Sequence, residues 1–290
     1  MPPSLPPLVV IAGPTASGKS AYALRIARER GGVIINADAS QCYAGLRILS
    51  ARPDDAEMAD IDHRLFGFLP PDRPLSAAAW STLAHAEIAA VQRAAQLPIL
   101  VGGTGLYLRT LLNGIAPVPD IDPDVRAAVR ILPVDALAEA LAAEDPVMAA
   151  RLGARDTQRL ARALEVMRSS GRSLAVFQNE IAGGIRDSVT LEPIVIDVDR
   201  DELVRRCDAR FDAMMAAGAL DEAARLAAMR LDPMLPVMKA IGVPPLLAHI
   251  AGAISLDDAI ARAKLDTRRY AKRQATWFRN QTPDWPRLRP

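Results

Sequence analysis

The feature that most constrains this chain is a continuous apolar run that leads directly into a glycine-rich stretch. Leu8–Ala12 is apolar throughout, which is typical of a strand buried on both faces of a parallel sheet. The next residues, GPTASGKS at 13–20, match the phosphate-binding pattern G-x-x-x-x-G-K-[ST] in full. Lys19–Arg30 is predicted to be a helix that stops at Gly31-Gly32. A strand, a glycine-rich loop and a helix in this order predict a cradle for an anion.

The chemistry of such a cradle follows from its parts. Backbone N–H groups and the positive end of the helix surround the anion, a lysine neutralises its oxygens, and a serine hydroxyl can bind Mg²⁺. Lys19 and Ser20 hold the last two positions here. We therefore expect Mg²⁺ as the cofactor, Ser20 as its protein ligand, and the whole loop as a phosphate-binding site. The loop consists of Gly13, Pro14, Thr15, Ala16, Ser17, Gly18, Lys19 and Ser20.

Further strands and helices alternate along the first part of the chain. Val33–Ala37 predicts a second short strand, and Pro98–Val101 predicts a third. Ser76 is a candidate cap for a helix that lies between them and runs to about Gln96. Strand, helix, strand, helix and strand predict an α/β fold, a P-loop-type parallel sheet with helices on both faces.

Two polar residues follow the predicted strands at their carboxyl ends. Asp38 comes directly after the second strand, and Thr104 follows the third strand after Gly102-Gly103. Because ligands bind at the carboxyl ends of such strands, we expect the cradle, Asp38 and Thr104 to meet at one edge of the sheet.

A nucleotide such as ATP is the default ligand of this loop pattern. A nucleoside triphosphatase normally carries an aspartate at the end of a buried strand to hold Mg²⁺, whereas the third strand here ends in two glycines. This difference argues against a motor or a switch protein. Asp38 could still serve a small-molecule or nucleotide kinase, so that alternative stays open.

The pattern changes where prolines interrupt it, at Pro117, Pro119 and Pro123. Short helices are predicted beyond this point, at 123–131, 134–143 and 157–170. A strand at 190–198 restores the α/β pattern, and the remainder is predicted to be helical. We therefore expect a P-loop α/β core with C-terminal helices, formed by residues 1–115 and 189–290, and a helical insertion at residues 116–188.

The insertion contains four arginines at helical spacing, Arg151, Arg155, Arg159 and Arg162. A continuous helix would align all four on one face. Gly153 and Asp156 instead indicate that the helix begins near Thr157, which leaves Arg159 and Arg162 as the better candidates for a basic surface.

A second basic patch lies at the C-terminal end, although the net charge of the whole chain is only +1. Residues 264–290 hold eight Lys and Arg against two Asp, a local net charge of +6. Tyr270, Trp277 and Phe278 are interleaved with these cations, a pattern that suits an RNA backbone or a stacked base. Helical spacing equally allows Tyr270 and Trp277 to lie in the core.

Other classes of protein are not favoured by the sequence. Cys42 and Cys207 cannot form a disulfide framework, and with three histidines they offer no zinc-ligand spacing. The N-terminal MPPSLPPL lacks the basic and long apolar parts of a signal peptide, and no apolar run is long enough to span a bilayer. We expect a cytoplasmic enzyme that does not contact membranes.

Several stretches, taken together, resemble the tRNA dimethylallyltransferases. They are GPTASGKS (13–20), NADASQCY (36–43), SARP (50–53), VGGTGLYLRTL (101–111), QRLARALEV (158–166) and TRRYAKRQATWFR (267–279). The similarity runs in order from about Val9 to Arg279, which is nearly the whole chain. The combination is far more specific than a P-loop alone.

The resemblance implies a reaction and roles for particular residues. The loop 13–20, together with Arg210, would bind the diphosphate of dimethylallyl diphosphate. The C5 unit would pass to N6 of adenosine 37, flipped out of the anticodon loop of a tRNA. Asp38 would act as the catalytic base and Thr104 would orient the reacting groups. We expect the enzyme to act as a monomer.

The resemblance also implies a set of residues that contact tRNA. They are Asp38, Ala39, Ser40, Gln41, Arg126, Gln158, Arg159, Leu160, Ala161 and Arg162. The family usually has serine where this chain has Ala39, and we expect Ser40 to supply the missing hydroxyl. The helical insertion would contact the anticodon arm. Two alternatives remain, a P-loop kinase and a non-catalytic RNA-binding P-loop module.

Overall fold

The computed structural model describes residues 5–58 and 60–289. The chain forms two compact units: the first is built from the residues up to Leu112 and from Ile185 onward, and the second from 113–184. Each unit has a hydrophobic core of its own. A hydrophobic core of its own is what makes each part of the chain a separate structural unit.

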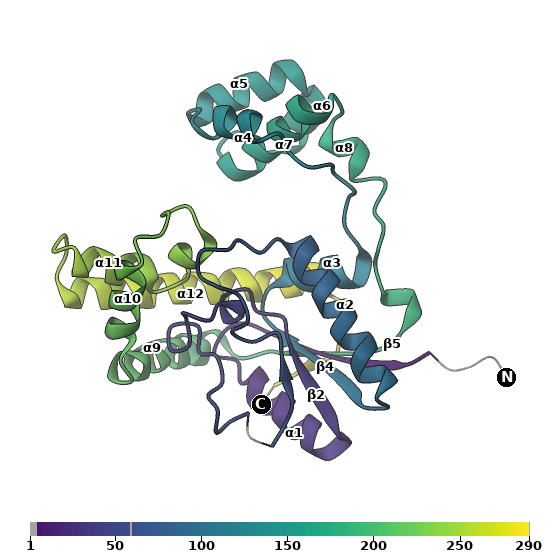
Figure 1. The fold of residues 1–290 in the computed structure, drawn as a ribbon, viewed down its shortest axis with the longest axis vertical. Coiled ribbons are helices and arrows are strands. Elements are labelled where there is room, and N and C mark those ends of the chain that lie inside the picture. The colour runs from purple at the N-terminus through teal and green to yellow at the C-terminus, as the bar shows by residue number, and fades with distance from the viewer. Residues whose placement is uncertain (1–4, 59, 290) are drawn as a thin grey trace. The chain divides into compact units, whose positions relative to one another are not determined.

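Within the described residues, the first unit is built on a six-stranded sheet in which all neighbouring strands are parallel. Its strands are β1 (Pro7–Ala12), β2 (Gly32–Asn36), β3 (His63–Arg64), β4 (Leu97–Gly102), β5 (Thr190–Ile196) and β6 (Arg287–Leu288). Their order across the sheet is β3-β2-β4-β1-β5-β6, and Figure 1 labels β2, β4 and β5 among them. The four predicted strands are confirmed as β1, β2, β4 and β5, with ends that differ by one or two residues.

The short edge strands β3 and β6 have no counterpart in the predictions, and the prediction of a wholly helical C-terminal part is wrong. Each is two residues long, which is too short for any alternation of apolar and polar residues. Ile34 of β2 lies opposite His63, and Ile196 of β5 lies opposite Leu288. Pairing with a distant part of the chain therefore makes these residues strands.

The helices of the first unit are α1 (Lys19–Arg30), α2 (Ala77–Arg93), α3 (Gly105–Asn113), α9 (Arg200–Ala216), α10 (Ala219–Ala228), α11 (Val243–Ile250) and α12 (Leu256–Gln281). Short 3₁₀ turns are η1 (Ser40–Cys42), η2 (Arg186–Ser188) and η3 (Pro236–Lys239). Ser76 caps α2 as predicted, since its Oγ accepts a hydrogen bond from the Ala79 N–H at 3.0 Å. α2 ends at Arg93, before the predicted Gln96, because Ala95 has a left-handed φ of 55°.

Successive residues of β1 face opposite sides of the sheet, as expected for a strand buried on both faces. Val10 belongs to the core on one side, where α2 contributes Trp80 and α12 contributes Phe278. Ile11 belongs to the core on the other side, where α1 contributes Ala23. Burying a side chain such as Ile11 stabilises the fold by roughly 1.5–3 kcal/mol. Helices on both faces confirm the predicted α/β fold class.

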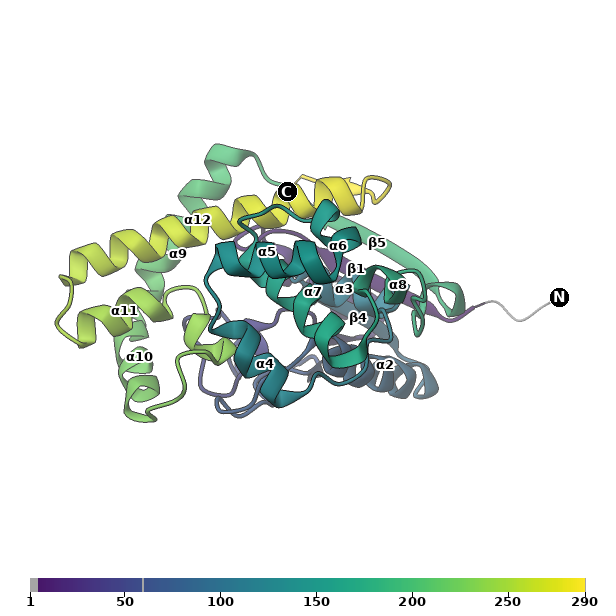
Figure 2. The ribbon, with the colours of Figure 1, turned by 90° about the horizontal axis from the view of Figure 1, so that it is seen from above.

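A third core forms among the C-terminal helices of the first unit. Leu46, Phe211, Val243 and Leu246 are buried together in it. Helix α12 packs against both α9 and α11 (Figure 2). This core fixes α9 and α12 beside the sheet, and these two helices carry several residues of the site.

The second unit is a set of helices, as predicted for the insertion. They are α4 (Pro123–Arg130), α5 (Val134–Glu144), α6 (Pro146–Arg151), α7 (Thr157–Ser170) and α8 (Leu174–Phe177). Val129, Leu137, Leu141 and Leu164 are among its buried residues. The short helices α6 and α8 were not predicted, although Asp145 followed by Pro146 is a helix-start pattern: the Asp145 carboxylate accepts from the Met148 N–H at 3.1 Å.

One continuous helix through the four arginines is not formed. Arg151 ends α6, and Arg155 lies in the turn that follows Gly153. Only Arg159 and Arg162 share α7, which begins at Thr157 as predicted. The glycine and the Asp156 cap interrupt what the spacing alone would allow.

None of the helices among the described residues has the length and apolar character needed to cross a membrane.

Candidate active site

A cavity of about 220 Å³ lies in the first unit, at the carboxyl ends of β1 and β2. Thr15 reaches it from the loop after β1, Asp38 from the segment after β2, Arg210 from α9 and Tyr270 from α12. The loop after β4 joins the same edge, because the Thr104 N–H donates to the Ala37 carbonyl at 3.2 Å. The prediction that these three strand ends meet at one edge of the sheet is confirmed.

The loop 13–20 wraps the N-terminus of α1. Gly13 has no room for a side chain, since a Cβ there would lie 2.8 Å from the Ile196 carbonyl oxygen. Gly18 has a left-handed φ of 92° and immediately precedes the helix. The exposure of the loop residues differs: Gly13, Pro14, Thr15 and Ser17 are buried, Ala16 and Lys19 are half-buried, and Gly18 and Ser20 are exposed. Ser17 Oγ is buried with no hydrogen-bond partner among the described residues.

Two cations stand beside this loop. Lys19 Nζ donates to the Pro14 carbonyl at 3.2 Å, and Arg210 Nη2 donates to Thr15 Oγ1 at 2.6 Å. Burial lowers the pKa of Lys19 from 10.5 to about 8, while Asp38 opposes this change and Arg210 adds to it. Burial also lowers the pKa of Arg210, again opposed by Asp38. Two desolvated cations at a helix N-terminus form a site that an anion would stabilise.

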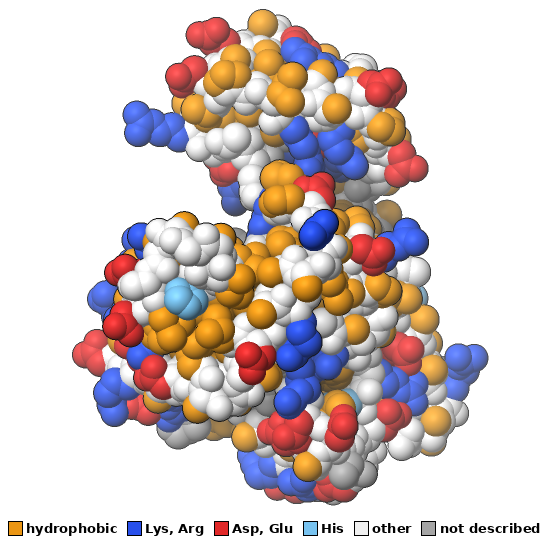
Figure 3. Space-filling view, turned by 60° about the vertical axis from the view of Figure 1, so that its left-hand side comes forward, with side chains coloured by type: hydrophobic (Ala, Val, Ile, Leu, Met, Phe, Trp, Pro, Cys, Tyr) orange, Lys and Arg blue, Asp and Glu red, His pale blue; other side chains and the backbone are white. Residues whose placement is uncertain are grey.

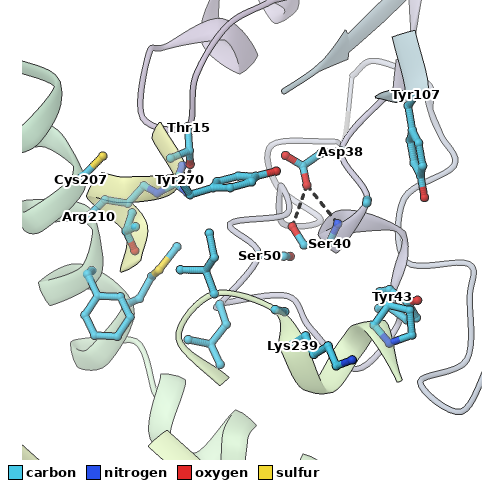
Figure 4. Close-up of a pocket in the computed structure, with 18 of the residues that line it drawn as sticks. Thr15, Asp38, Ser40, Tyr43, Ser50, Tyr107, Cys207, Arg210, Lys239 and Tyr270 are labelled. Atoms are coloured by element: carbon cyan, nitrogen blue, oxygen red, sulfur yellow. Dashed lines mark hydrogen bonds between the residues drawn. The ribbon is translucent and has the colours of Figure 1, made fainter. Parts of the chain in front are cut away.

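Asp38 is held in place by hydrogen bonds to Asn36, two residues before it, and to Ser40, two residues after it. Its Oδ1 accepts hydrogen bonds from Ser40 Oγ at 2.7 Å and from the Ser40 N–H at 3.1 Å (Figure 4). The buried Asn36 fixes its backbone, accepting from the Asp38 N–H at 2.8 Å and donating to the Asp38 carbonyl at 3.0 Å. Ser40 therefore supplies the hydroxyl that Ala39 cannot. The role of Asn36 was missed by the sequence analysis, although it stands only two residues before Asp38.

Thr104 lies next to this segment, and its Oγ1 accepts a hydrogen bond from the Ala39 N–H at 3.0 Å. Tyr270 reaches the same place from α12, and its hydroxyl points toward Asp38 (Figure 4). Burial raises the pKa of Tyr270, the Asp38 charge raises it further, and a hydrogen bond with Thr104 opposes both. Tyr270 thus lines the cavity and is half-buried. It is therefore neither a fully exposed residue nor a residue of the hydrophobic core.

The glycines of the stretch VGGTG let other elements approach closely. A Cβ on Gly102 would overlap the Ala37 backbone, and a Cβ on Gly105 would overlap the Trp277 ring. Trp277 is accordingly half-buried against the core, and its neighbour Phe278 is fully buried. These aromatic residues pack inward, while several cations of α12 remain exposed: Arg269, Lys272, Arg273 and Arg279.

The part of the cavity away from Asp38 is apolar. Its lining residues include Leu49, Phe211, Met214, Pro236 and Ile241. They come from the loop after η1, from α9 and from the η3 segment. The cavity therefore has charged side chains, Asp38 and Arg210, on one part of its wall and an apolar surface on another.

Segment 38–41 carries further predicted site residues. Ala39 and Ser40 line the cavity and are half-buried. Gln41 turns away to donate to the Ser50 carbonyl at 3.1 Å and to the Ala51 carbonyl at 2.8 Å. Its amide therefore connects this segment to the loop that supplies Leu49.

The second unit holds the remaining predicted residues. Arg126, Gln158, Arg159 and Arg162 are exposed, and Figure 3 shows Lys and Arg side chains at the surface of this unit. Leu160 is 2% exposed and belongs to the core, so its side chain supports α7 from within. Ala161 is half-buried.

A buried carboxylate lies beneath these arginines. Glu165 is 2% exposed and accepts from Arg130 Nε at 2.9 Å, with Arg162 Nη1 at 3.9 Å. Burial lowers the pKa of Arg162, and Glu165 opposes that change. Glu165 thus holds two arginines on one side of this unit, a role that its position within an apolar run of α7 does not indicate.

The fold and the site define an α/β protein with a glycine-rich loop and a lysine at the N-terminus of α1, beside a carboxylate and an apolar cavity. A sequence model of the family described as IPP transferase matches residues 41–281, and the chain belongs to this family. It is 56% identical over 282 residues to a tRNA dimethylallyltransferase of Sphingopyxis alaskensis, covering 97% of this chain and 92% of the relative.

Two solved structures share the fold. A tRNA delta(2)-isopentenylpyrophosphate transferase of Staphylococcus epidermidis has a TM-score of 0.70 and 31% identity, covering 98% of this chain and 93% of the other. A eukaryotic dimethylallyltransferase, described as acting on tRNA, has a TM-score of 0.85 and 26% identity, covering 98% of this chain and 74% of the other. The similarity therefore includes both units of the chain.

Proposed function

We propose that this protein transfers a dimethylallyl group from dimethylallyl diphosphate to N6 of adenosine 37 in the anticodon loop of tRNA, releasing pyrophosphate. The observation that carries the proposal is the cavity itself. It joins the desolvated Arg210, the Asp38 carboxylate and an apolar wall in one space. The desolvated Lys19 stands next to it, at the start of α1. Membership of the IPP transferase family supports dimethylallyl transfer to tRNA as the reaction.

The donor binds with its diphosphate in the loop 13–20 and its C5 unit along the apolar wall. Negative charge grows on the diphosphate as its bond to the allylic carbon breaks. Lys19, Arg210 and the N–H groups at the start of α1 stabilise this charge, and such fixed donors act most strongly where water is excluded.

Asp38 serves the acceptor. Adenine N6 is a poor nucleophile because its lone pair is delocalised into the ring. As the N6–carbon bond forms, the Asp38 carboxylate takes one N6 proton, and the electron pair of the broken carbon–oxygen bond leaves with pyrophosphate. Positioned bases of this kind accelerate reactions by about 10²–10⁴-fold. Ser40 orients the carboxylate, and Thr104 fixes the adjoining backbone.

The acceptor base must leave its stack before its amino group can reach a cavity. The segment 38–41 is proposed to contact the extruded adenosine. In the second unit, Arg126, Arg159 and Arg162 are proposed to bind phosphates of the anticodon arm, together with the neighbouring Gln158 and the backbone of α7 near Leu160 and Ala161. Exposed arginines suit this role because phosphate binding needs reachable positive charge.

Mg²⁺ fits the donor set that is present. No cluster of three acidic, histidine or cysteine side chains occurs among the described residues, and a diphosphate-bound Mg²⁺ does not require one, because it keeps waters and phosphate oxygens as ligands. The Ser20 hydroxyl is exposed at the first turn of α1 and would hold the ion. When bound, Mg²⁺ would neutralise diphosphate charge.

Two incubations with the same unmodified tRNA test the proposal. One contains dimethylallyl diphosphate labelled in its C5 unit, and the other contains ATP labelled in its γ-phosphate. We expect label in the tRNA only from the first. Transfer of the γ-phosphate to any acceptor would indicate a kinase, and binding of tRNA without transfer from either donor would indicate a non-catalytic module.

A further inference from the structure

We infer that Gln274 of α12 is a positioning residue that sets the spacing between the diphosphate-binding loop and the turn that carries Thr104. The inference deepens the proposed function and rests on it. Gln274 is 4% exposed. Its Oε1 accepts from the Thr15 N–H at 2.8 Å, and its Nε2 donates to the Gly103 carbonyl at 2.8 Å.

Only an amide of this length can satisfy both partners. The Thr15 N–H needs an acceptor and the Gly103 carbonyl needs a donor, so the orientation of the amide follows from the two backbone groups. A carboxylate offers no donor, and an apolar side chain offers neither, which would leave buried backbone groups without partners. A Cβ on Gly103 would overlap Nε2, so the turn after β4 is shaped around this side chain.

The two bonds connect the opposite sides of the proposed reaction. Thr15 is held on the donor side, by Gln274 at its N–H and by Arg210 at its Oγ1. On the acceptor side, Gly103 precedes Thr104, whose Oγ1 receives the N–H of Ala39. Ala39 directly follows Asp38. A shift of about 1 Å between reacting groups can cost 10²-fold in rate, so a fixed span between these two sides matters for turnover.

Helix α12 gives Gln274 a firm base. The side chains on the same face, Thr267, Ala271 and Phe278, are buried at the spacing of a packed helix stripe. Phe278 lies in the same core as β1 and β4 residues. The core of the first unit therefore fixes the distance between the loop 13–20 and the turn after β4.

The test compares Gln274→Glu and Gln274→Met with the wild type, with Gln96→Met as a matched control at an exposed glutamine. Four quantities are measured for each: the melting temperature, the dissociation constants of inorganic pyrophosphate with Mg²⁺ and of an unmodified anticodon stem-loop, and the single-turnover transfer rate. We expect Gln274→Met to bind pyrophosphate at least about tenfold more weakly and to transfer at least about tenfold more slowly, because both bonds are lost. Stem-loop binding should change by less than about twofold.

Gln274→Glu provides a second measurement, the pH dependence of the transfer rate, which a purely structural role of Gln274 would leave unchanged. A protonated carboxyl has the donor and acceptor of the amide, whereas the carboxylate has no donor. The transfer rate of this variant, divided by that of the wild type at the same pH, should therefore rise as the pH is lowered. A ratio that is independent of pH would contradict the inference.

The remaining outcomes are also decisive. Wild-type pyrophosphate binding and rate in a folded Gln274→Met variant would overturn the inference and leave the proposed function standing. Absence of transfer by the wild type would refute the proposed function. The pyrophosphate dissociation constants would still show whether the two hydrogen bonds of Gln274 support the loop. If Gln274→Met does not fold, the pH dependence of Gln274→Glu decides the question.

Discussion

The two units hold their polar residues in different ways. In the first unit, Thr15 and Thr104 are fixed by hydrogen bonds to residues that are far away in the sequence, such as Gln274 and Ala39. In the second unit, Arg159 pairs with Asp156 three residues away, and its side chain is 75% exposed. Bond-making chemistry requires a fixed geometry, whereas contact with RNA phosphates requires mainly charge that can adapt. This difference supports the proposed division of roles, in which the first unit carries out the reaction and the second unit binds the tRNA.

Glu165 refines this contrast. Most charge pairs of the second unit are exposed, and exposed pairs contribute little stability. Glu165 is a buried partner for Arg130 at 2.9 Å, and Arg162 lies 3.9 Å from the same carboxylate, so Arg130 is held more firmly than Arg159. The second unit therefore combines exposed arginines such as Arg159 with an arginine that a buried carboxylate holds in place.

Asp38→Ala is expected to produce the largest effect. Loss of the base should lower the turnover number by about 10²–10⁴-fold. Binding of the anticodon stem-loop, measured by fluorescence anisotropy, should remain nearly intact because the charges of the second unit are unchanged. Turnover comparable to that of the wild type would remove Asp38 from the mechanism and erase the contrast between the units.

The pH dependence of donor binding should be the next largest effect. With its pKa lowered to about 8, Lys19 is charged below this pH and neutral above it. Because the diphosphate needs the ammonium, the KM for dimethylallyl diphosphate should increase by up to about tenfold per pH unit above pH 8. Lys19→Arg stays charged and should flatten this increase. An equal increase in both proteins would assign the effect to another group.

Arg162→Ala should have a smaller effect, confined to tRNA binding. We expect the KM for tRNA to rise by about threefold to tenfold, and the slope of log affinity against log salt to fall by about one. The turnover number at saturating tRNA should be unchanged. Arg168→Ala is a matched control on the same helix, because Arg168 is paired with Glu144. Equal losses in both variants would mean that α7 makes no specific contact.

Ser40→Ala should have the smallest effect. Asp38 would keep the backbone N–H of Ser40 and lose only the hydroxyl at 2.7 Å. We expect the turnover number to fall by about threefold, in keeping with one hydrogen bond of modest net strength. Ser40→Thr retains a hydroxyl and should recover most of the rate. A loss as large as that of Asp38→Ala would mean that Ser40 itself contacts the reacting atoms.

Much of the first unit can be predicted from the sequence because its signals are local. The apolar run of β1, the loop pattern and the glycines after α1 follow one another in a single short stretch of the chain, and they predict the strand and the helix correctly. The position of Asp38 follows from the same logic, since it stands at the end of a recognisable strand. Ser40 could be anticipated because it neighbours the carboxylate that it orients.

The rest depends on contacts between distant residues. Gln274 meets Thr15 across 259 positions and Gly103 across 171, so no local pattern marks it. Tyr270 fits a helix face equally well as a core or a surface residue, and only the packing of α12 places it in the cavity. For α6, by contrast, the start pattern at Asp145 was present in the sequence and could have been used.

The most direct test of the central claim is mass analysis of an unmodified anticodon stem-loop after incubation with the protein, dimethylallyl diphosphate and Mg²⁺. The account predicts a gain of one dimethylallyl group, located by fragmentation at N6 of adenosine 37, and release of one pyrophosphate. A stem-loop with guanosine at that position should gain nothing. An unchanged mass for the adenosine-containing stem-loop under these conditions, with the protein folded and the RNA bound, would contradict the account.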